Sequence, residues 1–323
     1  MNYDFIEISQ SQDKDKPCLD YLEWQYSSRN GWEMYHIEGS RNMEIFISQD
    51  QLRIKGSLPY FTSGQNFYSG INDFRNGIDF LCDSLKLDLK MAEVNCLEYG
   101  TILEIPFKPK EIFLSHTGIQ GMKKRTFDNG IYFEDKVLKH KLYNAGINIK
   151  QKLSKQERMN LMPLGYDPKA NYLRIENHYK KPSIAFKKRD IQVRDILEDS
   201  FQALCREDLF NKYQSIMKTR QVRIQDKKNL SSATIPLLIL KEYAEFLPER
   251  PEDLIRERIK AIPEEVLSKN DKKSRLRQVR QNFKKIESKE SSPYDLSEIL
   301  KNKAIESQKE NIHKPIPSFR ECY

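Results

Sequence analysis

The stretch YLRIENHY, residues 172–179, alternates apolar and polar side chains with the period of two that is typical of a β-strand. Leu173 and Ile175 share one face of this strand, and Arg174, Glu176 and His178 share the other. The residues before it predict further strands at 94–105, around 126–133 and at 137–143. The middle of the chain therefore predicts a sheet with one polar face.

Towards the N-terminus the pattern predicts a hairpin and a helix. Residues 43–48 and 51–58 alternate around a Gln-Asp turn, and after Asn72, the expected N-cap, apolar residues follow at helical spacing. A short helix is expected at 109–116, and residues 1–31 are expected to form an arm whose aromatics pack onto the domain. This order of elements predicts an α+β domain over 1–190, with an antiparallel sheet and helices on one face.

The C-terminal part predicts helices rather than strands. Two amphipathic helices are expected at 193–205 and 209–217, and prolines delimit two more. Residues 272–286 hold seven basic residues and no acidic one, so this helix is expected to lie along DNA phosphates. The basic candidates are Arg275, Arg277, Arg280, Lys284 and Lys285. We thus expect a helical basic region over 191–286 and a flexible tail over 287–323.

Charge is distributed unevenly along the 323 residues. Residues 1–150 carry 18 Lys+Arg and 21 Asp+Glu, or −3, which leaves 37 and 26, or +11, for the rest. A basic half favours a polyanionic partner, although a surface tuned for solubility is the alternative. No apolar run is long enough to span a membrane, no secretory signal is visible, and the five scattered cysteines argue against a disulfide framework or a zinc site. These features predict a soluble protein of the cytoplasm.

Two glutamates and a histidine are the candidate metal ligands. Walker, dinucleotide-binding, zincin and nucleophile-elbow motifs do not occur in the sequence. On the expected strands, Glu98 lies on the same face as Cys96, and Glu176 and His178 share a face. If the strands are neighbours, Glu98, Glu176 and His178 form a site suited to Mg²⁺ or Mn²⁺, which polarises phosphate oxygens. The alternative is that the carboxylates pair with Arg174 or other bases on a solvated face.

A tyrosine between lysines is the candidate nucleophile. Lys139, Lys141 and Tyr143 share a face of the third expected strand, so the ammonium groups are expected to lower the pKa of the phenol. Such a tyrosine can attack a phosphodiester. The alternative is that Tyr143 packs at a sheet edge, as most tyrosines do, and Tyr132 with Lys136 is a comparable pair.

The order of these segments resembles replication initiators of the filamentous-phage gene-two type. The likeness covers roughly residues 45–220 and runs through Gly56-Ser-Leu, Asn66, the helix, Cys96-Leu-Glu-Tyr-Gly100, Lys141-Leu-Tyr-Asn144 and Tyr172-Leu-Arg-Ile-Glu176. It implies a Rep nickase-like fold that begins rolling-circle replication of a phage or plasmid. Tyr143 then matches the nucleophile that becomes linked to a 5′-phosphate, and Glu98 and Glu176 match the two acidic strand positions.

The chain also departs from that pattern. Asn144-Ala145 stands where the family usually has Asp-Lys after the tyrosine, and no histidine pair separated by one hydrophobic residue occurs. Lys139 or Lys141 is a candidate substitute for the missing lysine. Three functions therefore stay open: a metal-dependent single-strand DNA endonuclease and transesterase at an origin, in contact with host replication proteins; a non-catalytic DNA-binding or regulatory protein; and a protein-interaction module without DNA affinity.

Overall fold

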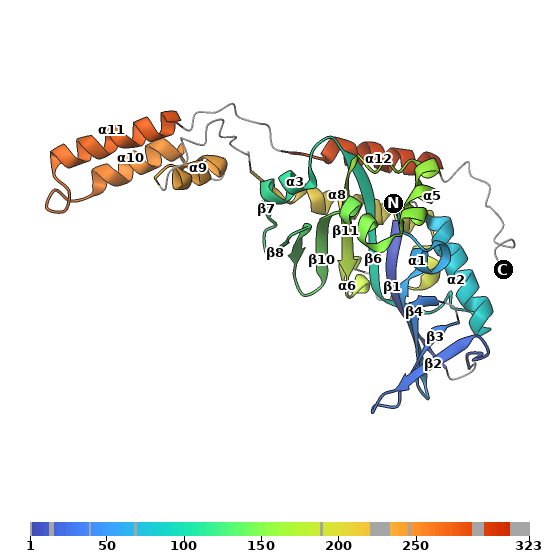
Figure 1. Cartoon of the computed structure of the whole chain (residues 1–323). Coiled ribbons are helices and arrows are strands. Elements are labelled where there is room, and N and C mark those ends of the chain that lie inside the picture. The colour runs from blue at the N-terminus through green and yellow to red at the C-terminus, as the bar shows by residue number, and fades with distance from the viewer. Residues whose placement is uncertain are drawn as a thin grey trace. The chain divides into compact units, whose positions relative to one another are not determined.

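A computed structural model describes residues 2–12, 16–38, 40–67, 70–187, 190–219, 233–244, 247–285 and 294–310. The described chain divides into two compact units. The first comprises residues 2–113, 118–216 and 296–310, and the second comprises 114–117 and 217–295. The first unit is an α+β domain built on an antiparallel sheet and the second is mainly helical, so the predicted fold class is confirmed (Figure 1).

One sheet of ten strands, among the described residues, forms the frame of the first unit. Its spatial order is β2-β3-β4-β5-β1-β6-β11-β10-β9-β8, and every neighbouring pair is antiparallel. The strands are β1 (Asn2–Ser11), β2 (Leu22–Ser27), β3 (Glu33–Ile37), β4 (Ser40–Ile47), β5 (Gln51–Ser57), β6 (Glu93–Ile105), β8 (Lys123–Phe127), β9 (Gly130–Glu134), β10 (Leu138–Asn144) and β11 (Asn171–Tyr179).

The N-terminal segment differs from the expected arm. Residues 2–11 form β1, which pairs with β5 on one side and β6 on the other and so lies in the interior of the sheet. Ile6 and Ile8 are almost completely buried there, which makes β1 part of the core. The single strand expected around 126–133 is also wrong, because β8 and β9 form a hairpin that turns at Asp128-Asn129.

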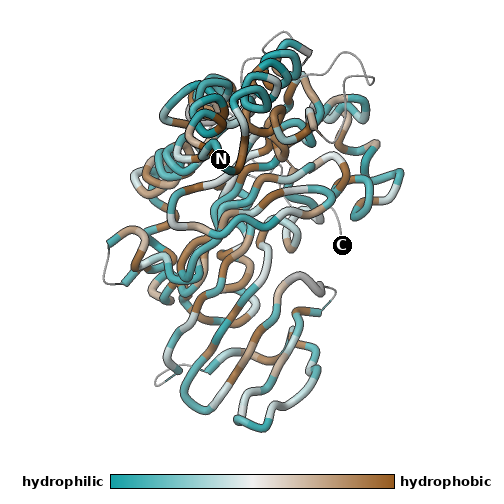
Figure 2. The backbone as a smooth tube through the Cα atoms, turned by 90° about the vertical axis from the view of Figure 1, so that its left-hand side faces the viewer, coloured by the Kyte–Doolittle hydropathy of each residue, from teal (hydrophilic) through white to brown (hydrophobic). Residues whose placement is uncertain are grey.

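The two longest helices of this unit cover one face of the sheet. Phe74 of α2 (Ile71–Leu85) meets Tyr3 with ring centroids 5.0 Å apart, and Asp208 of α8 (Asp199–Gln214) accepts a hydrogen bond from Tyr99. The α2 helix begins after Gly70, whose N–H donates to Asp73, and not after Asn72 as expected. Hydrophobic and hydrophilic residues alternate along strands such as β5 and β10, and the tube changes colour along the strands (Figure 2). The opposite face carries Glu98, Lys141 and Glu176, whose side chains contact one another, and it is therefore the polar one.

Short helices cover one end of that polar face. They are α1 (Leu58–Ser63), α4 (Ala145–Lys152), α5 (Lys155–Leu161) and the 3-10 turn η1 (Met162–Leu164). Ala145 and Ile149 of α4 pack in a small core with Tyr172 and Phe67. The helices therefore do not all lie on one face, and they leave the middle of the polar face uncovered.

The remaining helices of the first unit are α3 (Pro109–Ser115), α6 (Pro182–Ala185), α7 (Val193–Ile196) and α12 (Ser297–Glu310). The last of these falls in the segment expected to be a flexible tail. Leu296 and Leu300 are buried, and the backbone N–H of Leu296 donates to the Tyr213 hydroxyl of α8. The structure thus differs from the expectation over 294–310, while 287–293 and 311–323 lie outside the described residues.

The second unit contains a helical hairpin. Its helices are α9 (Ile235–Glu242), α10 (Pro251–Ala261) and α11 (Lys269–Lys285), and β7 (His116–Gly118) pairs with β12 (Met217–Lys218) at its start. Lys272 of α11 donates to the carbonyl of Lys260 in α10, which ties the two helices together. A search of the described helices found none that is both long enough and apolar enough to cross a bilayer.

Candidate active site

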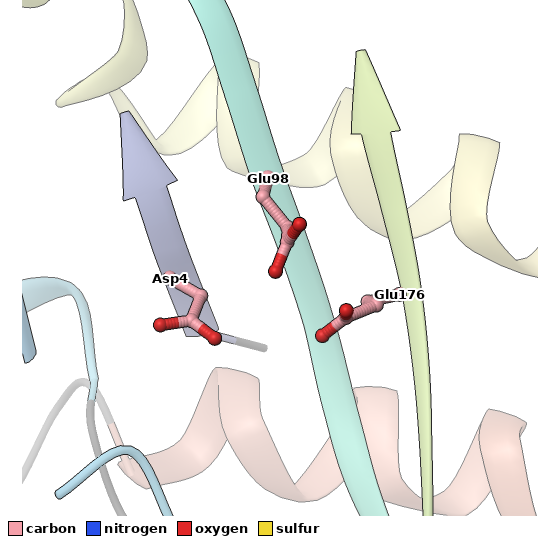
Figure 3. A group of neighbouring side chains, drawn as sticks. All are labelled: Asp4, Glu98 and Glu176. Atoms are coloured by element: carbon pink, nitrogen blue, oxygen red, sulfur yellow. The ribbon is translucent and has the colours of Figure 1, made fainter. Parts of the chain in front are cut away.

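Three carboxylates meet on the polar face of the sheet. Asp4, Glu98 and Glu176 come from the neighbouring strands β1, β6 and β11, and one oxygen of each lies within 4.8 Å of the others (Figure 3). Their exposed fractions are only 7%, 7% and 1%. The register places Glu98 opposite His178 and Gly100 opposite Glu176, so the two glutamates lie one row apart on the same face.

Gly100 allows the close approach of β11 at this point. A Cβ atom on residue 100 would clash with the Ile175 carbonyl oxygen and would lie 2.6 Å from the Glu176 Cβ. Since real Cβ atoms do not approach so closely, a side chain here would displace Glu176. The glycine thus fixes the position of one carboxylate.

A β-bulge brings the third carboxylate to the same face. Tyr3 pairs with Tyr99 and Ile6 with Leu97, so both Asp4 and Phe5 stand opposite the single residue Glu98. With strict alternation Asp4 would share the apolar face with Ile6. The extra residue of the bulge turns the Asp4 side chain to the polar face instead. Asp4 was missed in the sequence because only the pairing of β1 with β6 reveals the bulge.

Two basic side chains, Lys141 and Arg174, lie between the carboxylates. Lys141 Nζ is 2.5 Å from Glu98 Oε2 and 2.7 Å from Glu176 Oε1. Arg174 donates to Glu176 at 2.6 Å and to Asp4 at 2.7 Å. Ion pairing with Arg174 is therefore present, as the alternative interpretation expected, but on a buried face. The cluster thus holds three carboxyl groups and the two basic side chains Lys141 and Arg174.

The pKa values in the cluster reflect this pairing. Burial alone would raise the pKa of Glu98, but the hydrogen bond from His178 and the charge of Lys141 outweigh it and lower the pKa to about 2. Burial would lower the pKa of Lys141, and the charges of Glu176 and Glu98 raise it above its usual range instead. Both groups are therefore charged at neutral pH.

Tyr143 lies beside the cluster, with its hydroxyl donating to Glu176 Oε2 at 3.0 Å. Burial, and next the charge of Glu176, raise the pKa of Tyr143 well above its usual value. The expectation that lysines lower this pKa is wrong, because burial and the charge of Glu176 act in the opposite direction. The other lysine, Lys139, lies apart from the cluster, with its Nζ 3.9 Å from Glu134.

His178 contacts the carboxylates from the side. Its Nδ1 lies 2.8 Å from Glu98 Oε2, and its Nε2 lies 3.5 Å from the Cys96 sulfur. Among the described residues, the group whose ligand atoms all lie within 4.8 Å of one another consists of Asp4, Glu98 and Glu176. In this geometry His178 orients Glu98 and is not itself a member of the group.

A pocket of about 280 Å³ opens over the cluster. The three carboxylates, Lys141 and Tyr143 form part of its lining, and the remaining lining residues are Asn66, Phe127, Asn129, Gly130, Tyr132, Asn148 and Lys152. Carboxylate oxygens are hard ligands of the kind that Mg²⁺ and Mn²⁺ prefer, and the carboxyl groups outnumber the basic side chains of the cluster. Asp4, Glu98 and Glu176 are thus the residues that can hold a divalent ion next to a phenol.

Basic residues lie along α11, in the second unit. Lys273, Arg277, Arg280 and Lys284 are exposed and follow each other at four, three and four residues, so they form one stripe of the helix. Arg275 is also exposed but falls outside this stripe by helical periodicity. The side chain of Lys285 lies outside the described part of the structure.

Comparisons with known proteins give little similarity. No protein-family model matches the sequence, and no curated protein matches it. Among solved structures, the chain is similar to a rolling circle replication initiator protein from Geobacillus stearothermophilus, with 10% identity and a TM-score of 0.38 over 74% of this chain and 95% of that chain. This structural similarity is too weak to assign a family or an activity. The function therefore has to be inferred from the geometry of the site.

Proposed function

We propose that this chain is a replication initiation protein of a phage or plasmid that nicks one DNA strand through Tyr143. The observation that carries the proposal is the meeting of a phenol, three carboxylates and a lysine in one pocket of the sheet. A phosphodiester bound in this pocket would contact the Tyr143 hydroxyl as nucleophile and the three carboxylates as ligands of a divalent cation. Strand transesterification requires both.

The reaction follows from the contacts of Tyr143. Its hydroxyl already donates to Glu176, so this carboxylate is the acceptor of the phenolic proton. The phenolic oxygen then forms a bond to phosphorus while the bond from phosphorus to the 3′-oxygen breaks. That oxygen takes a proton from solvent water and leaves as a hydroxyl, and Glu176 returns the phenolic proton to the solvent. The products are a 5′-phosphotyrosine at Tyr143 and a free 3′-end that can prime synthesis.

Asp4, Glu98 and Glu176 are the proposed ligands of Mg²⁺ or Mn²⁺. A bound divalent ion would supply the positive charge that stabilises the phosphate and the deprotonated phenol. Lys141 holds Glu98 and Glu176 together in the absence of an ion, and it is the residue we propose in place of the lysine that the family usually has after its tyrosine. The exposed stripe on α11 is proposed to bind phosphates of the origin DNA.

A non-catalytic DNA-binding protein is the second candidate. It is favoured by the raised pKa of Tyr143 and by the cations that already pair with all three carboxylates. The side chain of Asn144 accepts a hydrogen bond from the N–H of Ile147 and caps α4, so this residue has a structural role. In this second function the ion pairs of the cluster only stabilise the packing of β1, β6, β10 and β11, and the cluster catalyses no reaction.

A covalent adduct separates the two functions. The full chain is incubated with Mn²⁺ and the supercoiled DNA of the element that encodes it, and the products are run under denaturing conditions. Nicked DNA that carries the protein is expected for the wild type and for Tyr21→Phe, a control at an exposed tyrosine outside the pocket lining, and is expected to be lost in Tyr143→Phe. An adduct that survives in Tyr143→Phe, or that never forms, contradicts the proposed chemistry.

A further inference from the structure

Two aromatic side chains line the rim of the pocket, on the side of the β8–β9 hairpin. Phe127 and Tyr132 have ring centroids 4.7 Å apart with an angle of 43° between the rings. Phe127 is 49% exposed although it is a large apolar residue. Tyr132 is partly buried, so the exposed ring of Phe127 is the one available to a flat ligand at the opening of the polar pocket.

The sheet register connects this pair to Tyr143. Phe127 pairs with Gly130, and Gly130 pairs with Tyr143, so the three residues form one row across three strands. A Cβ atom on Gly130 would lie only 2.7 Å from the Tyr143 Cβ. Because residue 130 has no side chain, the space between the phenol and the Phe127 ring stays open. Two strand spacings put the two backbones about 10 Å apart.

Basic residues surround the same rim. Arg125 stands opposite Tyr132 in the register, Lys139 Nζ lies 5.8 Å from the centre of the Tyr132 ring, and Lys152 from α4 lines the pocket. Residues 123–152 hold eight Lys+Arg and three Asp+Glu, or +5, whereas residues 1–150 together hold −3. The segment that carries the aromatic pair therefore has a net positive charge.

We propose that Phe127 and Tyr132 stack an unpaired base of single-stranded DNA next to the phosphate that Tyr143 attacks. Aromatic rings among cations are the common means of holding single strands, because every base has a flat face and every nucleotide a phosphate. Arg125, Lys139 and Lys152 contact the neighbouring phosphates. The assignment of the attacked phosphate rests on the proposed function, but the binding of the strand does not.

Fluorescence anisotropy tests the stacking platform without any chemistry. A labelled oligothymidylate of about 12 nucleotides, within the usual range of site sizes, is titrated with the full chain in EDTA. Phe127→Ala and Phe127→Leu are expected to weaken binding about tenfold, since both remove the ring and the second keeps apolar volume. Tyr132→Phe is expected to bind as the wild type does, because it keeps its ring.

Phe80 provides a matched control. It is 47% exposed and pairs with Phe61 at 5.2 Å, but it lies on α2, away from the pocket lining. Equal affinities of Phe80→Ala and Phe127→Ala for the oligonucleotide overturn the platform, as does a wild type that does not bind it. Loss of binding in Phe127→Ala without any adduct in the wild type supports the platform and refutes the nicking. A Tyr143-dependent adduct together with full binding by Phe127→Ala refutes the platform and supports the nicking.

Discussion

Replacing Lys141 by alanine removes the cation that lies between two buried carboxylates. Lys141 Nζ contacts Glu98 at 2.5 Å and Glu176 at 2.7 Å, and its side chain is only 16% exposed. Removing one partner of such a buried pair costs about 3–5 kcal/mol, because the remaining charges stay desolvated and repel each other. For a domain of this size that corresponds to a fall of roughly 10 °C in the melting temperature.

Thermal unfolding followed by circular dichroism measures this effect, with Lys139→Ala as the matched control. Lys139 is on the same strand and face, but it is 30% exposed and its Nζ is 3.9 Å from Glu134, so its loss costs at most about 1 kcal/mol. Adding Mn²⁺ is expected to raise the melting temperature of Lys141→Ala more than that of the wild type, because the freed carboxylates bind the ion. Equal melting temperatures of the two lysine variants would refute the reasoning.

Three further predictions concern other parts of the domain. Asp4→Asn is expected to weaken the affinity for Mn²⁺ about tenfold or more, so that a correspondingly higher Mn²⁺ concentration is needed for the same rise in melting temperature, and unchanged stabilisation excludes Asp4 as a ligand. Gly130→Ala is expected to destabilise by about 1–3 kcal/mol and to abolish adduct formation, because the new methyl group meets Tyr143; an active variant contradicts the contact. Burial lowers the pKa of His140 to about 4, below its value of about 6.5 in the unfolded chain, so the unfolded state binds the proton first. Stability is expected to fall by about 3 kcal/mol between pH 6.5 and 4, and a flat urea-unfolding profile over that range contradicts it.

The sequence by itself determined which side chains share a face of each strand. Alternation along 94–100, 137–143 and 172–179 placed Glu98, Lys141, Tyr143 and Glu176 correctly, because a strand has a fixed period of two. Proline positions and helical spacing likewise predicted α10 and α11. Local geometry depends only on neighbouring residues, and so it can be read from them.

Pairing between distant segments was decided only by the tertiary structure. The bulge that turns Asp4 towards Glu98 exists because β1 gains one residue against β6, and residues 2–11 carry no local mark of it. The same holds for Tyr143, whose pKa is raised by burial and by the charge of Glu176, which lies 33 residues away along the chain. Burial and charge pairing arise from contacts between strands that are distant in the sequence. No single stretch of sequence contains such contacts.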